Sequence, residues 1–369
     1  MQHIKGAEEL SAWYETKFKG RVNYFKPDYP MEINIDQRDE LVGYCEQFVK
    51  YADDAYFNGL NVRLYTNIDH VHDFWSENWW PHSHTVMPHG VVYTIDDGGK
   101  IDFREFCKGP IEKPEINAGG FYNRETKTAI IFNQDYYGQT KPTALGIAAE
   151  IFEDRFGILS VHGASGAVSG KGYLLIAPTN TGKTTHSYGP AIHHPQGEFH
   201  QDDWIFVRFE SGKAFGYPSE RKFYMRTNSI KNFPWLEPTF RKNKLENVKP
   251  DDPTEKFLPS HPRVMIDPKL ILKPEKVVSE IRISKTFLLK RDTEDNVVAT
   301  SLDPDEAVGI LRKAPEQWYN NYLITYGDRK VERRAELFRR LFEIAEPYQI
   351  NIVADVDTIR KIIIKIAGS

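Results

Sequence analysis

The chain has 369 residues, 40% of them hydrophobic and 13% aromatic, so it carries enough apolar side chains for a sizeable core. Its 48 Lys and Arg residues nearly balance 52 Asp and Glu residues, which excludes an extended disordered chain and argues against a nucleic-acid coat protein. No run approaches the roughly 18 consecutive apolar residues of a membrane span, and the N-terminus lacks an apolar signal core. Two cysteines, Cys45 and Cys107, cannot build a disulfide scaffold. We therefore expect a cytoplasmic protein with free thiols that binds neither nucleic acid nor membrane.

The first 150 residues predict an aromatic-rich α+β domain. Apolar side chains at three- and four-residue spacing predict a helix over residues 39–57. Short apolar runs predict strands at 61–65, 90–95 and 128–132. A helix is expected over 144–156, and Gly157 should end it.

Residues 151–369 have the pattern of an α/β core, in which strands and helices mix. Strands are expected at 158–162, 173–177, 204–209, 281–289 and 350–354. Helices are expected over 303–313, over 330–345 and from residue 356 onward. Residues 228–278 hold many Pro, Lys, Asn and Asp residues with little periodicity, so they are a candidate lid or insertion. The chain thus predicts two domains, residues 1–150 and 151–369.

The most informative stretch runs from residue 177 to residue 185, directly after the apolar run 173–176. It fits the phosphate-loop pattern G-x-x-x-x-G-K-[ST] at every defined position except the first, where Ala177 replaces glycine. The backbone N–H groups of such a loop and of the following helix make an anion site, and Gly182 allows close approach of the phosphates. We expect Lys183 to reach the β- and γ-phosphates and Thr184 to ligate Mg²⁺. The predicted nucleotide-binding residues are Pro178, Thr179, Asn180, Thr181, Gly182, Lys183, Thr184 and Thr185.

An acidic pair, Asp202 and Asp203, leads into the apolar run 204–209. A phosphoryl-transfer site needs one acidic group for Mg²⁺ and often another to accept the substrate hydroxyl proton. Upstream, residues 161–168 are expected to pair with the phosphate-loop strand and to carry His162 to the nucleotide end of the sheet. An Asp-Asp pair or a lone histidine is by itself more often structural. The order of histidine, phosphate loop and acidic pair along the chain is what favours a phosphoryl-transfer site.

That order resembles the nucleotide-binding core shared by HPr kinase/phosphorylase and ATP-dependent phosphoenolpyruvate carboxykinase. Residues 157–168 look like the carboxykinase histidine strand, and residues 178–187 look like its phosphate loop with paired threonines. Residues 201–203 are similar to the acidic pair of both families. The match covers residues 157–227 closely and the region from residue 150 onward loosely. The resemblance implies a phosphate-loop core with a mixed sheet, preceded along the chain by the aromatic N-terminal domain.

The resemblance also implies roles for individual residues. Asp202 would lie near the metal, and Asp203 would be the general base in a kinase or a second metal contact in a carboxykinase. His162 would pair with the catalytic aspartate in a kinase or bind Mn²⁺ in a carboxykinase. Which aspartate takes which role stays open from sequence alone.

The charged residues after residue 219 are further candidates. Glu220 is a candidate metal contact, and Arg221 or Lys222 could steady the transferred phosphate, because residues 216–222 fall where the similar proteins return a strand towards the site. A solvated, charged strand end explains the same three residues equally well.

The expected function is that of a divergent HPr-kinase-like enzyme. Phosphoenolpyruvate carboxykinases are considerably longer, and the signature region of bifunctional HPr kinases is not found after the acidic pair. We expect an ATP- and Mg²⁺-dependent kinase, with Mn²⁺ as a second metal, that phosphorylates a hydroxyl group of a small metabolite with Asp203 as base. Self-association is expected because related kinases assemble. The alternatives are a protein serine kinase of HPr-kinase type, a carboxykinase-like lyase and a nucleotide-binding regulator without transfer.

A histidine- and tryptophan-rich stretch spans residues 70–90. A His-x-His pair can bind Zn²⁺, but no cysteine lies near it and no acidic residue stands at a recognisable metal spacing. A structural or subunit surface is favoured, and an acceptor pocket is the alternative. The residues are His70, His72, His82, His84 and His89 with Trp75, Trp79 and Trp80.

Overall fold

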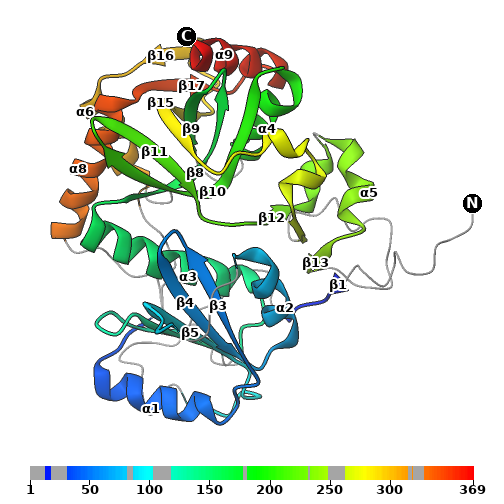
Figure 1. The fold of residues 1–369 in the computed structure, drawn as a ribbon, viewed down its shortest axis with the longest axis vertical. Helices are drawn as coiled ribbons and strands as arrows, with labels where there is room; N and C mark the ends of the chain where they lie inside the picture. Colours follow the sequence, from blue (N-terminus) through cyan, green and yellow to red (C-terminus); the bar gives the residue numbers. More distant parts are fainter. Residues whose placement is uncertain are drawn as a thin grey trace, which may run out of the picture. The chain divides into compact units, whose positions relative to one another are not determined.

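The computed structural model describes residues 13–17, 31–80, 86–102, 118–177, 181–231, 233–247, 262–314, 318 and 328–369. These residues form a mixed α/β fold with three sheets, in two compact units (Figure 1). The first unit holds the described residues of 1–148 and 220–271, and the second holds those of 149–219, 272–320 and 325–369. The chain therefore returns to the first unit after residue 219. The segment 228–278, expected as a lid or insertion, belongs to that unit up to residue 271.

A six-stranded sheet forms the centre of the first unit. Helix α1 (Ile35–Glu46) packs against it through Leu41 and Cys45, which share a buried cluster with Tyr93 and Phe121. Helix α2 (Asp69–Asn78) follows the β3–β4 hairpin. The strand order is β2 (Met31–Glu32), β6 (Gly119–Asn123), β7 (Thr128–Phe132), β5 (Gly90–Ile95), β4 (Leu60–Thr66) and β3 (Tyr51–Phe57).

The helix predicted over residues 39–57 is wrong in its second half. Helix α1 ends at Glu46, and residues 51–57 form strand β3. Asn58 and Gly59 have positive φ values of 43° and 105°, and Phe57 pairs with Leu60 across them. An Asn-Gly dipeptide between apolar runs is the strongest short-range hairpin signal, and here it decides against the helical spacing.

A small second sheet completes the first unit. Its order is β1 (Trp13–Tyr14), β13 (Lys244–Glu246), β14 (Arg263–Ile266) and β12 (Phe223–Arg226). Short helical turns connect or follow its strands along the chain: η4 (Thr227–Lys231), η5 (Pro234–Leu236), α5 (Glu237–Phe240) and η6 (Pro268–Leu270). These turns and short strands explain why residues 228–271 show little periodicity.

A seven-stranded mixed sheet forms the second unit. Strands β9, β15 and β17 run parallel, whereas β8, β10 and β11 join them through antiparallel pairs. Strand β11 also pairs with β15, so the sheet bends back on itself. The order is β11 (Lys213–Pro218), β10 (Gly197–Glu210), β8 (Leu159–Val168), β9 (Lys171–Ile176), β15 (Ile281–Lys290), β17 (Glu346–Asn351) and β16 (Ala299–Ser301).

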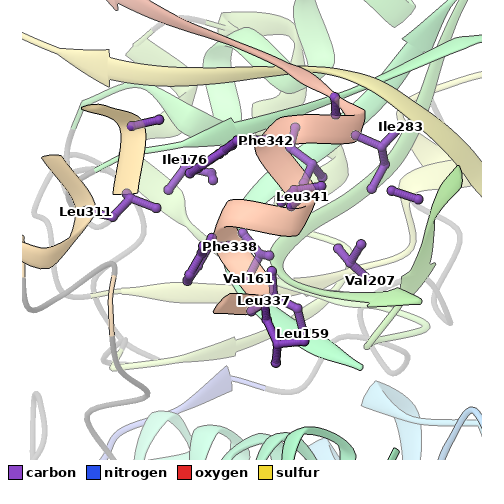
Figure 2. Packing of buried hydrophobic residues seen from close by; sticks show 14 of the residues in the cluster. Leu159, Val161, Ile176, Val207, Ile283, Leu311, Leu337, Phe338, Leu341 and Phe342 are labelled. Carbon is purple, nitrogen blue, oxygen red and sulfur yellow. The ribbon is translucent and has the colours of Figure 1, made fainter. Parts of the chain in front are cut away.

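Helices cover both faces of this sheet. On one face, α8 (Asp328–Ile344) lays Phe338 and Leu341 over Val161 and Ile176 (Figure 2), and α6 (Pro304–Arg312) adds Leu311. On the other face, α9 (Val356–Gly368) packs on the alternate strand residues and contacts α4 (Lys183–His193). Because side chains alternate across a strand, each strand supplies both cores.

The predictions for the second unit hold with shifted boundaries. Helix α3 (Tyr137–Ile151) starts earlier than expected and continues as a π-helical turn, η3 (Phe152–Phe156), which Gly157 ends at a φ of 62° as predicted. The last strand is β17, which begins four residues before the predicted one. A single turn, η7 (Pro274–Lys276), precedes β15. None of the helices among the described residues combines the length and apolarity that crossing a bilayer requires.

Candidate functional site

Elements of the second unit meet beyond one end of strand β9. Strand β9 ends at Ile176, which pairs with Gly163 of β8, and Gly163 in turn pairs with Asp203 of β10. His162 therefore lies one step beyond the end of β9, next to the start of helix α4 at Lys183. The register brings together residues from three separate stretches of sequence.

The loop between β9 and α4 is described at its two ends only. Ala177 is fully buried, and Thr181 is half-buried. Gly182 precedes the first residue of α4 with a φ of 81°, a conformation that strains any residue with a Cβ atom. Pro178, Thr179 and Asn180 lie outside the described residues, so their role in binding a nucleotide stays a prediction.

Lys183 and His162 are in direct contact. The Lys183 Nζ atom lies 2.9 Å from His162 Nε2, and Asp203 Oδ1 lies 3.3 Å from the same ring nitrogen. A neutral imidazole accepts a hydrogen bond from the ammonium group at this nitrogen, whereas a protonated imidazole donates from it to the carboxylate. One nitrogen atom therefore faces both the cation and the carboxylate of the predicted site.

Trp204 holds the His162 ring in place. The two residues are paired across β8 and β10, and their rings stack with centroids 5.2 Å apart at an angle of 11°. Trp204 is only 4% exposed, so this contact fixes the plane of the imidazole. Trp204 was not among the predicted site residues. Its position directly after the acidic pair was the only signal for it.

Thr184 and Asp202 form a second pair. The Thr184 hydroxyl donates to Asp202 Oδ2 at 2.8 Å, and the backbone N–H of Asp203 donates to Asp202 Oδ1 at 3.1 Å. Burial of the Asp202 carboxyl raises its pKa, and the neighbouring Asp203 raises it further, while the Thr184 hydrogen bond opposes the shift. A hydroxyl oxygen beside a carboxylate oxygen is the type of ligand that Mg²⁺ prefers.

Asp203 has an unusual backbone conformation. Its φ is 84°, a region that residues other than glycine rarely adopt, although Asp and Asn tolerate it best. A register shift in β10 between Phe199 and Gln201 precedes it. The Asp203 side chain is 41% exposed, in contrast to the largely buried residues around it. Such strain costs about 1–3 kcal/mol and is concentrated at functional sites.

Gly163 allows β8 and β9 to approach each other beside His162. A Cβ atom at this position would lie 2.5 Å from the backbone oxygen of Leu175. Because backbone atoms cannot rotate away, a larger residue would push the strand that carries His162.

Glu220, Arg221 and Lys222 belong to the first unit and have partners there. Both carboxylate oxygens of Glu220 lie 3.0 Å from Lys141 Nζ, in a pair that is almost completely buried. The Arg221 guanidinium donates to the backbone oxygen of Glu77 at 2.8 Å, and Lys222 forms an ion pair with the Glu77 carboxylate. These contacts do not support the metal and phosphate roles predicted for the three residues.

The histidine- and tryptophan-rich stretch is described in part. His70 lies 3.3 Å from the Glu246 carboxylate, and His72 stacks on Tyr51. His82 and His84 lie outside the described residues. Within the described ranges, no group of three or more His, Cys, Asp or Glu side chains is arranged to hold a metal ion. Trp75 and Trp79 are buried.

Comparison of the chain with models of protein families and with curated proteins finds no match in either case.

Proposed function

We propose that this protein is an ATP- and Mg²⁺-dependent kinase that transfers the γ-phosphoryl group to a hydroxyl group of a small metabolite. The observation that carries the proposal is the set of contacts at the end of β9. Lys183 and Asp203 share His162 Nε2, while Thr184 is bonded to Asp202. These are the residue types that phosphoryl transfer needs for phosphate binding, proton transfer and metal binding.

The donor nucleotide would bind at the start of α4. The free N–H groups of a helix N-terminus and its dipole attract phosphate, and Lys183 adds a full positive charge. A bound phosphate would draw Lys183 away from His162, because a phosphate oxygen is a stronger acceptor for an ammonium group than an imidazole nitrogen. His162 would then be available to hydrogen-bond to Asp203.

Thr184 and Asp202 would hold Mg²⁺, and their oxygen atoms suit that ion. When bound, Mg²⁺ neutralises charge that develops on the phosphate oxygens. Asp203 is the better candidate for the base, since its carboxylate is more exposed and lies beside the His162 ring. It would accept the proton of the acceptor hydroxyl as that oxygen attacks the γ-phosphorus.

The acceptor is proposed as a small hydroxylated metabolite because the site needs only an alcohol held in line with the donor. The same site chemistry would serve a serine of a partner protein, the nearest alternative. We further propose that the fold of the second unit is the phosphate-loop core of the HPr kinase and carboxykinase group, and that the protein acts in the cytoplasm. The order of His162, the loop and the acidic pair along the chain supports this assignment.

The test is an acceptor screen with the full-length chain. The protein is incubated with Mg-ATP and a pool of sugars, cyclitols, amino acids and nucleosides, and products are identified by mass spectrometry. We expect one compound to gain a phosphoryl group with wild-type protein. Asp203→Asn should lower that rate by about 10²- to 10⁴-fold while ADP binding persists, since asparagine tolerates the positive φ. Asp305→Asn, at an exposed position of α6, is the matched control.

The outcomes separate the alternatives. Equal turnover by Asp203→Asn and wild type would remove Asp203 as the base. Bound ATP without any phosphorylated product would favour a protein acceptor or a regulator. Release of CO₂ from oxaloacetate with Mn²⁺ would favour the carboxykinase-like lyase.

A further inference from the structure

Strand β15 ends beside the loop that follows β9. The two strands are parallel and adjacent, and Leu288 pairs with Ile176 at the end of β9. Arg291 follows Leu288 by three residues, so it extends beyond the sheet on the same side as the β9–α4 loop. In open α/β sheets, ligands bind beyond the carboxyl ends of parallel strands.

The turn that carries Arg291 is held by its neighbours. Lys290 Nζ pairs with the Asp295 carboxylate at 2.6 Å, and the Asn351 amide donates to the backbone oxygens of Asp292 and Asp295 at 2.7 Å. Arg291 itself is exposed and makes no hydrogen bond or ion pair with another residue of the described part of the chain. This turn thus presents an exposed arginine that no described residue pairs with.

The charge of Arg291 reaches the first turn of α4. His186 lies in that turn, where its backbone N–H donates to the Gly182 backbone oxygen. Its side chain is 4% exposed, and Nδ1 has no hydrogen-bond partner among the described residues. The pKa of His186 is lowered to about 4, chiefly by burial and additionally by the nearby charges of Arg360 and Arg291. Arg360 is paired with Asp357 at 2.9 Å, whereas no carboxylate of the described residues pairs with Arg291.

Arg291 lies on the opposite side of β9 from the residues proposed for the reaction. His162 and Asp203 are on β8 and β10, whereas β15 lies beyond β9 in the sheet order. A polyphosphate at the start of α4 with its reacting end towards β8 would therefore present its other end towards β15. An arginine there stabilises bound donor and transition state alike, which changes donor affinity and leaves the transfer step unchanged.

We propose that Arg291 binds the non-transferred phosphates of the donor nucleotide and sets its affinity. This inference rests on the proposed function, because it requires a nucleoside polyphosphate at the start of α4. It adds a residue from a part of the chain more than 100 positions away from the phosphate-loop motif.

The test is calorimetric titration of full-length variants with ADP, in the presence and absence of Mg²⁺. We expect Arg291→Ala to weaken ADP binding by about 10- to 100-fold, the range that a hydrogen bond to a charged group provides. Arg291→Lys should recover part of that loss, because it keeps the charge but not the planar fork of donors. Arg282→Ala is the matched control, since Arg282 is exposed near the start of β15, at the end opposite to Arg291.

Each result bears on a different claim. Unchanged ADP affinity in Arg291→Ala, with ADP bound by wild type, overturns the role of Arg291 and leaves the proposed kinase intact. An equal loss of ADP affinity in Arg282→Ala would mean that an arginine in this region acts only through its long-range charge, which also overturns the specific role of Arg291. Wild-type protein that binds no ADP removes both proposals. A thermal melt of each variant shows that the compared proteins are folded.

Discussion

Glu220 should matter for stability rather than for metal binding. Its carboxylate and the ammonium group of Lys141 are 1% and 4% exposed, and the two lie 3.0 Å apart. The Asn78 amide also donates to Glu220 at 2.9 Å, and the Tyr137 hydroxyl donates to Asn78 at 2.7 Å. Glu220→Gln keeps the shape and the acceptor for Asn78 but removes the negative charge that lies 3.0 Å from the buried Lys141 ammonium group.

The expected cost follows from that loss of charge. Removing one partner of a buried ion pair typically costs about 3–5 kcal/mol, because the remaining charge keeps its desolvation penalty. Domains as a whole have a free energy of unfolding of about 5–15 kcal/mol. For a unit of this size the change lowers the melting temperature by about 6–20 °C. Lys141→Met in the Glu220→Gln background also removes the buried positive charge and should restore much of the loss.

The assay must separate the two units, since a chain of two units need not unfold in one step. Hydrogen exchange followed by mass spectrometry reports the opening free energy of each segment. We expect lower protection in α2 and α3 for Glu220→Gln and unchanged protection in β8 and β9. Glu46→Gln, at an exposed position of α1, is the control. Protection in α2 within about 1 kcal/mol of wild type would refute the assigned cost of the buried charge.

Two further substitutions test the second unit. Because the pKa of Asp202 is raised, the contribution of its protonated form to stability is complete below the ordinary pKa of an aspartate and is lost as the pH rises through the raised value. Asp202→Asn should therefore stabilise the unit at pH 7 by about 0.5–2 kcal/mol, measured by urea unfolding. Mg²⁺-dependent ADP binding should fall in the same variant. A less stable Asp202→Asn protein would contradict this reasoning. Gly163→Ala should destabilise the same unit by about 1–3 kcal/mol, because its Cβ would meet the Leu175 backbone, and an unchanged melting curve would show that β8 can shift freely.

The sequence contained enough information to bring the candidate site together. The hairpin of β8 and β9 turns at Ser169 and Gly170, both with positive φ, and this turn fixes the register that carries His162. The apolar run before Lys183 forms β9, and a helix follows it. These features are local, since short turns and alternation decide them, and local features are what a single sequence specifies best.

Contacts between residues far apart in the chain could not be predicted from the sequence. Glu220 follows the second unit directly along the chain, and its partner Lys141 comes 79 positions earlier, in a helix that no motif connects with it. No local pattern distinguishes a carboxylate that ligates a metal from one that neutralises a buried lysine. The same limit hid Arg291, because its place near α4 depends on the register of β15 beside β9.

The arrangement of charge in the second unit favours one orientation of a polyphosphate bound at the proposed site. Half-buried Asp202 and strained Asp203 lie on β10, at the side of His162, whereas Arg291 and Arg360 act on the first turn of α4 from the turn after β15 and from α9. An anionic ligand entering between them would meet positive charge at one end and, at the other, a carboxylate that can bind metal or accept a proton. Because like charges repel, the acidic side would be favourable for a phosphate only once Mg²⁺ is present. Mg²⁺ should therefore strengthen binding of ATP, whose third phosphate would extend towards β10, more than binding of AMP. An equal effect of Mg²⁺ on AMP and ATP affinity would contradict this orientation.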